Sequence, residues 1–247
     1  MDVAVVIPVF NKERHVERAI QSALSQTLSP AEILIVDDAS TDGSRDRIAA
    51  FSSPLIAVLR RSAPGPGGYA ARNLAIERAR SPWIAFLDAD DAWAPDHLQS
   101  IGDAIARNDC DPAIGCVFTG YQNIYEGGRA VPDGYTRQIG RSRDRRLDFV
   151  GFLETWLRLR ECPVWTSAAA FRRDVLLEAG LFPAGRCARG GDKDLWLRAA
   201  RHADVLACAS ATAMYHRESM NMVTRISTTN LRHCLCDTID SALFPAA

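Results

Sequence analysis

Three aspartates end the stretch WIAFLDADD, which covers residues 83–91. The residues before them are largely apolar, which is typical of a buried strand. A D-x-D pair at the end of a strand offers hard oxygen ligands to Mg²⁺ or Mn²⁺, and such a metal keeps coordination positions for phosphate oxygens. Asp88 and Asp90 are therefore candidate metal ligands. For any single aspartate, a solvated turn or a helix cap would be an equally good explanation.

A second acidic pair, Asp37 and Asp38, lies near the end of the stretch EILIVDDAS at residues 32–40. In open α/β sheets, ligands gather beyond the carboxyl ends of the strands. Two acidic clusters at successive strand ends therefore favour a binding site over two unrelated turns. Asp38 would accept a hydrogen bond from a base or a ribose, as carboxylates do in nucleotide pockets.

The elements that must position these carboxylates alternate along the first half of the chain. Continuous apolar runs are typical of buried parallel strands, and apolar residues at helical spacing indicate amphipathic helices. We expect strands at residues 3–10, 32–40, 55–61 and 83–91, and helices at residues 16–24, 45–51, 69–80 and from Pro95 onward. This alternation predicts one α/β domain with a mostly parallel central sheet and helices on both faces.

The second half of the chain is less regular. We expect strands at residues 114–125 and 165–173, a polar loop at 141–147, and helices at 149–159, 174–179 and 192–202. No element is predicted after residue 202. No internal repeat or clear linker divides the chain, so we expect a single domain with two functional halves.

Composition excludes several classes of protein. The formal net charge is −1 and 47% of the residues are hydrophobic. A chain with so little net charge has no global field to recruit nucleic acid, so we expect no nucleic-acid partner. No apolar run approaches the ~18 residues of a membrane span, and we recognise no signal peptide. The sequence does not fix the oligomeric state.

The seven cysteines show no framework spacing. This pattern favours reduced thiols and a cytoplasmic location. Cys234 and Cys236 form a C-x-C without the second pair that a zinc site would need, so we interpret them as structural or incidental.

A competing motif is GPGGYA at residues 65–70, which matches the G-x-G-x-x-A fingerprint of dinucleotide-binding proteins. It leaves an NAD-dependent oxidoreductase as an alternative. The motif follows the third expected strand instead of the first, and a proline separates its first two glycines, so a flexible loop is the favoured interpretation. No P-loop motif is present.

Together these pieces resemble the family 2 glycosyltransferases of GT-A fold. The matching stretches are VVIPVFNKE, SALSQT, EILIVDDASTDGS, GGYAARNLAIERARSPWIAFLDADD and GGDKDLWLRAA. The resemblance implies an inverting transfer from a nucleotide-diphosphate sugar, with UDP favoured, to a hydroxyl acceptor, assisted by Mn²⁺ or Mg²⁺. It implies one GT-A domain with a nucleotide-sugar-binding half (1–115), an acceptor and catalytic-base half (116–215) and a C-terminal tail (216–247).

The resemblance also implies roles for individual residues on the donor side. Asp38 would bind the base, the backbone of Pro8 and Val9 would line the base pocket, and Arg72 would be the nucleotide-side arginine. Asp88 and Asp90 would form the metal-binding pair, with Asp88 also touching the nucleotide and Asp90 the better direct ligand.

On the acceptor side, Asp192 matches the family's general base. The glutamate that normally precedes it is replaced by Gly191, which puts the choice of acceptor in doubt. Asp194 is assigned a structural role on the same helix. His216 falls where the family often has a histidine near the diphosphate, so it is a weak candidate metal ligand, and a surface histidine is an equal alternative.

Three tryptophans of this half, Trp156, Trp165 and Trp196, would either stack on sugars or belong to the core, and the core is favoured. Two further alternatives stay open: a sugar nucleotidyltransferase and a non-catalytic nucleotide-sugar-binding protein. The acceptor would be a glycan or a lipid-linked sugar, and a lipid-linked acceptor would bring the chain to the inner face of the membrane.

Overall fold

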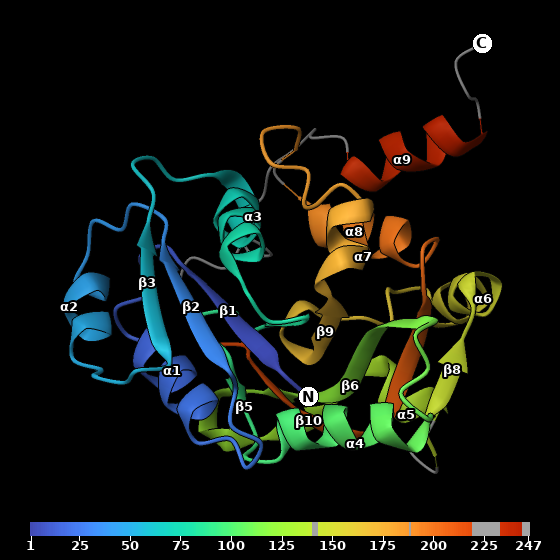
Figure 1. Ribbon diagram of the computed structural model, residues 1–247, viewed down its shortest axis with the longest axis horizontal. Helices are drawn as coiled ribbons and strands as arrows, with labels where there is room; N and C mark the ends of the chain where they lie inside the picture. Colours follow the sequence, from blue (N-terminus) through green and yellow to red (C-terminus); the bar gives the residue numbers. More distant parts are fainter. Residues whose placement is uncertain (140–142, 188, 219–232, 244–247) are drawn as a thin grey trace.

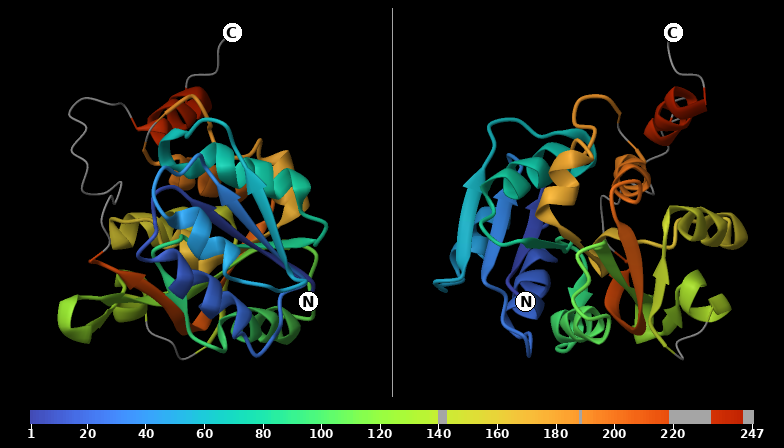
Figure 2. Two further views of the ribbon diagram at one scale, coloured as in Figure 1. Left: turned by 90° about the vertical axis from the view of Figure 1, so that its left-hand side faces the viewer. Right: turned by 45° about the vertical axis from the view of Figure 1, so that its right-hand side comes forward.

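A continuous sheet crosses the molecule and carries helices on both faces (Figures 1 and 2). The computed structural model describes residues 1–139, 143–187, 189–218 and 233–243. In this part of the chain the strands are β1 (Val3–Val9), β2 (Glu32–Asp37), β3 (Ile56–Arg60), β4 (Trp83–Phe86), β5 (Ala92–Trp93), β6 (Ile114–Ile124), β7 (Ala130–Pro132), β8 (Arg145–Leu147), β9 (Ala169–Arg172) and β10 (Asp204–His216). Their order is β3-β2-β1-β4-β9-β6-β10-β5, with β7 beside β6 and β8 beside β10.

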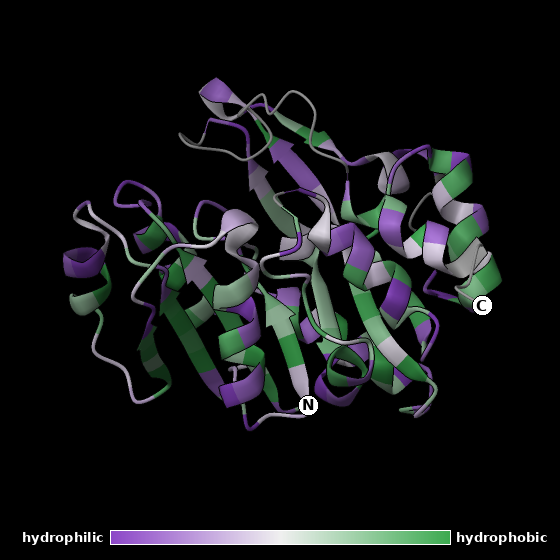
Figure 3. Ribbon diagram, turned by 90° about the horizontal axis from the view of Figure 1, so that it is seen from above, coloured by the Kyte–Doolittle hydropathy of each residue, from purple (hydrophilic) through white to green (hydrophobic). Residues whose placement is uncertain are grey.

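Most of the helices cover the two faces of this sheet. The helices are α1 (Val16–Leu24), α2 (Ser44–Ala49), α3 (Tyr69–Arg78), α4 (His97–Arg107), α5 (Gly134–Ile139), α6 (Phe149–Leu159), α7 (Arg173–Glu178), α8 (Gly191–Ala199) and α9 (Cys234–Leu243). Apolar residues of α1, α2 and α4 pack on one face, and those of α3, α6, α7 and α8 pack on the other. Figure 3 shows the apolar residues gathered along the central strands.

The first half of the sheet is parallel. Strand β1 lies between β2 and β4, and β3 continues the same direction at the edge. Nearly all residues of β1 and all residues of β2 are buried, as expected for strands covered on both faces. Because parallel strands end at one edge of the sheet, the segments after β1, β2 and β4 meet there. Two of the turns at this edge place non-glycine residues at positive φ, namely Asn11 (52°) and Ala39 (61°).

The second half mixes directions. The short strand β9 is antiparallel to both β4 and β6, while the long strands β6 and β10 run parallel to each other with register shifts. The long pairings are thus parallel and the short ones antiparallel. The predicted α/β domain with a mostly parallel sheet and helices on both faces is confirmed. Its division at residues 115 and 215 stays a prediction.

The largest difference from the sequence prediction is β10, which no pattern indicated. It lies inside the sheet between β6 and β5. Its stretch ACASATA consists of small residues and does not produce the bulky apolar run by which the other buried strands were recognised.

Smaller differences concern the bounds of elements. The expected strand at 165–173 begins with a 3₁₀ turn at Thr166–Ala168, and β9 starts only at Ala169. Within the expected polar loop at 141–147, residues 145–147 form β8, while residues 141 and 142 lie outside the described residues.

Two cysteines form a disulfide that the sequence did not indicate. The structure joins Cys187, in the loop before α8, to Cys234 at the start of α9 by a disulfide, with the Cα atoms 5.8 Å apart. The expectation of reduced thiols is therefore wrong for this pair. The bond ties α9 to the loop that leads into α8.

Candidate active site

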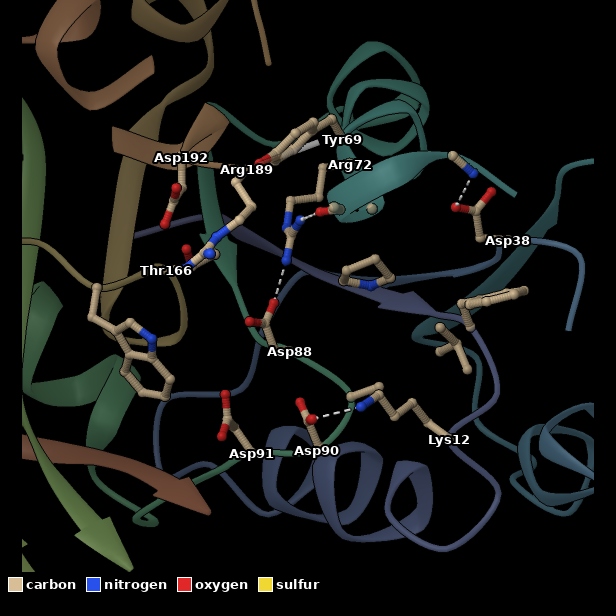
Figure 4. Close-up of a pocket in the computed structure, with 18 of the residues that line it drawn as sticks. Lys12, Asp38, Tyr69, Arg72, Asp88, Asp90, Asp91, Thr166, Arg189 and Asp192 are labelled. Atoms are coloured by element: carbon tan, nitrogen blue, oxygen red, sulfur yellow. Dashed lines mark hydrogen bonds and ion pairs between the residues drawn. The ribbon is translucent and has the colours of Figure 1, made fainter. Parts of the chain in front are cut away.

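A cavity of about 340 Å³ lies at the carboxyl ends of the parallel strands. Both halves of the chain line it. The lining comes from the end of β1, from the segments after β1, β2 and β4, and from the starts of α3 and α8. The lining includes the predicted residues Pro8, Val9, Asp38, Arg72, Asp88, Asp90 and Asp192. Figure 4 shows Asp38 at one end, Asp192 at the other, and Arg72 and Asp88 between them.

Asp38 forms one end of the cavity. Its side chain is almost fully buried and accepts hydrogen bonds from Arg61 and from the backbone N–H of Gly65 at 3.1 Å. Its neighbour Asp37 does not line the cavity. Burial opposes ionisation of Asp37, but hydrogen bonds from Ser40 and Arg45 outweigh it and lower the pKa of this carboxyl. Asp37 thus fixes the turn after β2.

Asp88 and Arg72 form an ion pair in the middle of the cavity. The guanidinium also donates to the carbonyl of Gly67 at 2.7 Å and lies 5.5 Å from the ring centroid of Phe182. Burial raises the pKa of Asp88, Arg72 opposes that effect, and Asp90 adds to it. Arg72 is therefore held in place by three contacts, with its charge directed at the cavity.

Asp90 pairs with a cation that sequence reasoning did not single out. The Lys12 ammonium lies 2.7 Å from Asp90 Oδ2, and the two side chains are only 13% and 15% exposed. Lys12 comes three residues after the end of β1, in the stretch PVFNKE, and it also lines the cavity.

Asp91 is the structural member of the acidic cluster. It is buried, accepts a hydrogen bond from Ser167 Oγ at 2.7 Å, and accepts another from the backbone N–H of His216 at 3.2 Å. Ser167 Oγ in turn accepts from the backbone N–H of Asp88 at 3.0 Å. Burial raises the pKa of Asp91, and Asp90 and Asp88 raise it further. These bonds connect the DADD turn with the end of β10.

His216 is not placed as the predicted metal ligand. It does not line the cavity, and its Nε2 atom has no hydrogen-bond partner among the described residues. Burial and then Arg18 lower the pKa of this imidazole to about 4. Within the residues that the structure describes, no group of three or more His, Cys, Asp or Glu side chains could hold a metal ion. The structure therefore does not join His216 to Asp88 and Asp90 as a set of three ligands.

Asp192 lies in the first turn of α8 on the far side of the cavity from Asp38. The residue before it, Gly191, stands where the family has a glutamate, and its surroundings leave no room for that side chain. The N–H of Gly191 donates to Tyr69 Oη at 2.9 Å, and a Cβ at Gly191 would lie 2.7 Å from Tyr69 Cζ and 2.8 Å from Pro183 Cγ. The ring of Tyr69 thus occupies the space that a glutamate side chain would enter. Asp194 is buried and paired with Arg198 at 2.7 Å, which fits its predicted structural role.

The aromatic residues divide as follows. Trp196 is 1% exposed and stacks on Phe171 with ring centroids 4.3 Å apart, so it belongs to the core. Trp165 instead lines the cavity beside Tyr215, at a centroid distance of 4.6 Å, and contacts Tyr121 at the same distance. Trp165 and Tyr215 give the cavity an aromatic wall.

The GPGG stretch is also part of the cavity. Gly67 and Gly68 both have positive φ (66° and 65°), and the turn leads directly into α3. Gly67 carries the carbonyl that holds Arg72. The loop is thus an ordered turn that positions a cavity residue. It follows β3, whereas a dinucleotide fingerprint follows the first strand of its sheet.

Comparisons with known proteins agree with this geometry. Residues 4–177 match the family model of Glycosyl transferase family 2. An uncharacterized glycosyltransferase of Nostoc sp. (strain PCC 7120 / SAG 25.82 / UTEX 2576) is 34% identical over 180 residues, covering 71% of this chain and 52% of that protein. The succinoglycan biosynthesis protein ExoW of Rhizobium meliloti (strain 1021) is 39% identical over 113 residues, which is 43% of this chain and 35% of ExoW.

Among solved structures, residues 1–349 of S. aureus TarS in complex with UDP-GlcNAc share the fold, with a TM-score of 0.76. The sequence identity is 16%, and the match covers 92% of this chain and 62% of that one. The chain therefore spans about half of the Nostoc relative and a smaller share of ExoW. No helix in the described residues is long and apolar enough to cross a membrane.

Proposed function

The chain belongs to glycosyl transferase family 2, and from this premise we propose that it transfers a sugar from a UDP-sugar to a hydroxyl acceptor, with inversion, in polysaccharide biosynthesis. One observation carries the proposal: a single cavity contains a nucleotide end at Asp38, a charged centre at Arg72 and Asp88, and a carboxylate at Asp192. This is the order in which a base, a diphosphate and a reacting sugar follow one another in a nucleotide sugar.

The donor side supports a UDP-sugar. Pro8, Val9 and Asp38 line the nucleotide end, where Asp38 would accept from the base. The structural neighbour TarS has been crystallised with UDP-GlcNAc and with UDP, and this likeness favours the same nucleotide here. Arg72 and Lys12 lie at the middle of the cavity, where their charges would bind the two phosphates.

Asp88 and Asp90 fit a divalent metal. They supply two carboxylates to the same cavity, and Mg²⁺ commonly uses one or two carboxylates together with waters and substrate phosphates. A bound Mn²⁺ or Mg²⁺ would neutralise the diphosphate and so make it a better leaving group.

Asp192 acts as the general base in this proposal. Its carboxylate takes the proton of the acceptor hydroxyl while that oxygen attacks the anomeric carbon from the face opposite the diphosphate. The bond from the anomeric carbon to the diphosphate oxygen breaks, and UDP leaves with the electron pair. Because Asp192 lies across the cavity from Asp38, it faces the sugar end of a bound donor.

The role in polysaccharide biosynthesis rests on the likeness to ExoW, which is named for succinoglycan biosynthesis. The cytoplasmic location and the attachment to the inner face of the membrane stay predictions. The disulfide between Cys187 and Cys234 removes the part of that prediction that relied on reduced thiols.

A thermal-shift screen tests the donor assignment. UDP-, GDP-, dTDP- and CDP-sugars, and separately NAD(H), are each added with Mn²⁺ and with EDTA. A ligand at ~100 times its Kd that binds only the folded chain adds about 2.7 kcal/mol of stability, which is readily detected. We expect stabilisation by a UDP-sugar that is larger with Mn²⁺. Stabilisation by NAD(H) and by none of the nucleotide sugars would contradict the proposal.

A further inference from the structure

Two cationic side chains on the acceptor side of the cavity have no partner within the described residues. Arg189 and Lys193 both line the cavity and flank Asp192 in the chain. Neither side chain makes a hydrogen bond or an ion pair with any other residue that the structure describes. Figure 4 shows Arg189 extending into the cavity between Asp192 and Arg72.

The other cations around the cavity are already neutralised by carboxylates. Arg72 pairs with Asp88, and Lys12 pairs with Asp90 at 2.7 Å. Arg61 pairs with Asp38 in the same way. The donor side is therefore balanced internally, whereas the acceptor side presents two cations beside the single carboxylate of Asp192. Uncompensated positive charge in a cavity attracts an anionic ligand.

We propose that Arg189 and Lys193 form a phosphate-binding subsite for an acceptor that carries a phosphate group. This inference rests on the proposed function and specifies its acceptor. A guanidinium binds two phosphate oxygens at once, and an ammonium adds a second point of charge. The sugar of such an acceptor would lie against the aromatic wall of Trp165 and Tyr215. Its hydroxyl would then lie within reach of Asp192.

The backbone that carries Arg189 is held in a defined conformation. Gly190, the next residue, has a φ of +76°, and a Cβ there would lie 1.7 Å from Cε1 of His233. His233 thus packs directly on this turn. The disulfide from Cys187 to Cys234 attaches the same loop to α9. The contact of Gly190 with His233 and the disulfide at Cys187 thus hold the chain close to Arg189, which lines the cavity.

Calorimetry with small probes tests the subsite. Glucose 1-phosphate and glucose are titrated into the full chain with its donor side saturated by UDP and Mn²⁺. We expect glucose 1-phosphate to bind at least tenfold more tightly, and high salt to reduce the difference because the subsite is open to solvent. Arg189→Ala and Lys193→Ala should each remove most of the difference. The control Arg186→Ala removes an equal charge from the same loop outside the cavity and should leave it unchanged.

A second series of measurements distinguishes binding of an acceptor phosphate from binding of the donor diphosphate. It also controls for misfolding of the variants. UDP affinity should stay within about twofold of wild type in both alanine variants, and Arg189→Lys and Lys193→Arg should keep the preference for the sugar phosphate. Equal binding of the two sugars by the wild type would overturn the proposal. So would a loss of UDP affinity as large as the loss for the sugar phosphate, because the cations would then serve the donor diphosphate. Failure of the wild type to bind UDP at all would instead contradict the proposed function.

Discussion

The two sides of the cavity differ in how their charged residues are held. On the proposed donor side, Asp38, Asp88 and Asp90 each have an internal cation within hydrogen-bond distance. On the proposed acceptor side, Arg189 and Lys193 have no carboxylate partner among the described residues. Asp192 lies there in the first turn of α8. A prearranged donor side suits a ligand that is the same in every reaction cycle. An acceptor side with unpaired charges leaves its electrostatic contacts to the acceptor.

Replacement of Asp192, the proposed base, tests this contrast most strongly. Asp192→Asn keeps the shape of the side chain but cannot take a proton, and loss of a general base typically slows a reaction about 10² to 10⁴-fold. We expect transfer to fall by that factor while the affinity for UDP, measured by calorimetry, stays unchanged. Asp46→Asn, an exposed change on α2, serves as the control. Full activity in Asp192→Asn would assign the base to another residue.

Gly191, which precedes the proposed base, gives the next effect in size. Gly191→Glu restores the family residue, but the new side chain would meet Tyr69 and Pro183 within 3 Å of its Cβ. Overpacking of a buried position typically costs about 1–3 kcal/mol. We expect urea denaturation to show that loss, and transfer to fall instead of rise.

Ala184→Glu places the same charge at an exposed position of the neighbouring loop and should leave stability almost unchanged. A stable and more active Gly191→Glu variant would show that the ring of Tyr69 moves aside at little cost in stability. The acceptor side would then be closer to the family pattern than the contacts of Tyr69 indicate.

The same contrast explains what could be predicted from the sequence. Donor-side residues follow strands of bulky apolar residues within short motifs, so Asp38, Asp88 and Asp90 were recognisable together with the parallel half of the sheet. The acceptor side combines segments that are far apart, since Tyr69 contacts Gly191 across 122 positions. Its strand β10 is built from small residues, and no local pattern joins Trp165 to Tyr215. Sequence reasoning missed Lys12 on the donor side, although its place shortly after the first strand was a usable signal.

A buried histidine beside β10 predicts a dependence on pH. His97 Nδ1 lies 2.8 Å from Thr212 Oγ1 of β10, and its ring stacks on Trp93. Burial lowers its pKa to about 3, far below the ordinary value of 6.5. Between pH 6.5 and pH 3, the unfolded chain therefore binds a proton at His97 and the folded chain does not. This contribution to stability is present above pH 6.5 and is lost as the pH falls toward 3.

The loss amounts to at most ~1.4 kcal/mol per pH unit below 6.5, or about 2 kcal/mol at pH 5. Urea denaturation from pH 7 to pH 5 measures it. His97→Gln cannot be protonated and should show a weaker dependence on pH, at the cost of lower stability at pH 7. His202→Gln, an exposed change, should keep the dependence of the wild type. Identical slopes for the wild type and His97→Gln would mean that this histidine is accessible to protons in the fold.

The ion pair of Lys12 with Asp90 predicts the smallest effect and the sharpest distinction between the two sides. Lys12→Ala removes the ammonium that lies 2.7 Å from the Asp90 carboxylate, in a cavity where both side chains are largely buried. The metal then no longer competes with an ammonium, so we expect Mn²⁺, followed by its electron paramagnetic resonance signal, to bind about threefold to tenfold more tightly without donor. UDP in EDTA should bind more weakly, because one phosphate loses a cation. Arg47→Ala removes an exposed charge from α2 and should change neither affinity. Unchanged Mn²⁺ affinity in Lys12→Ala would show that Asp90 does not contact the metal, and the donor side would then hold its diphosphate through Arg72 and Lys12 alone.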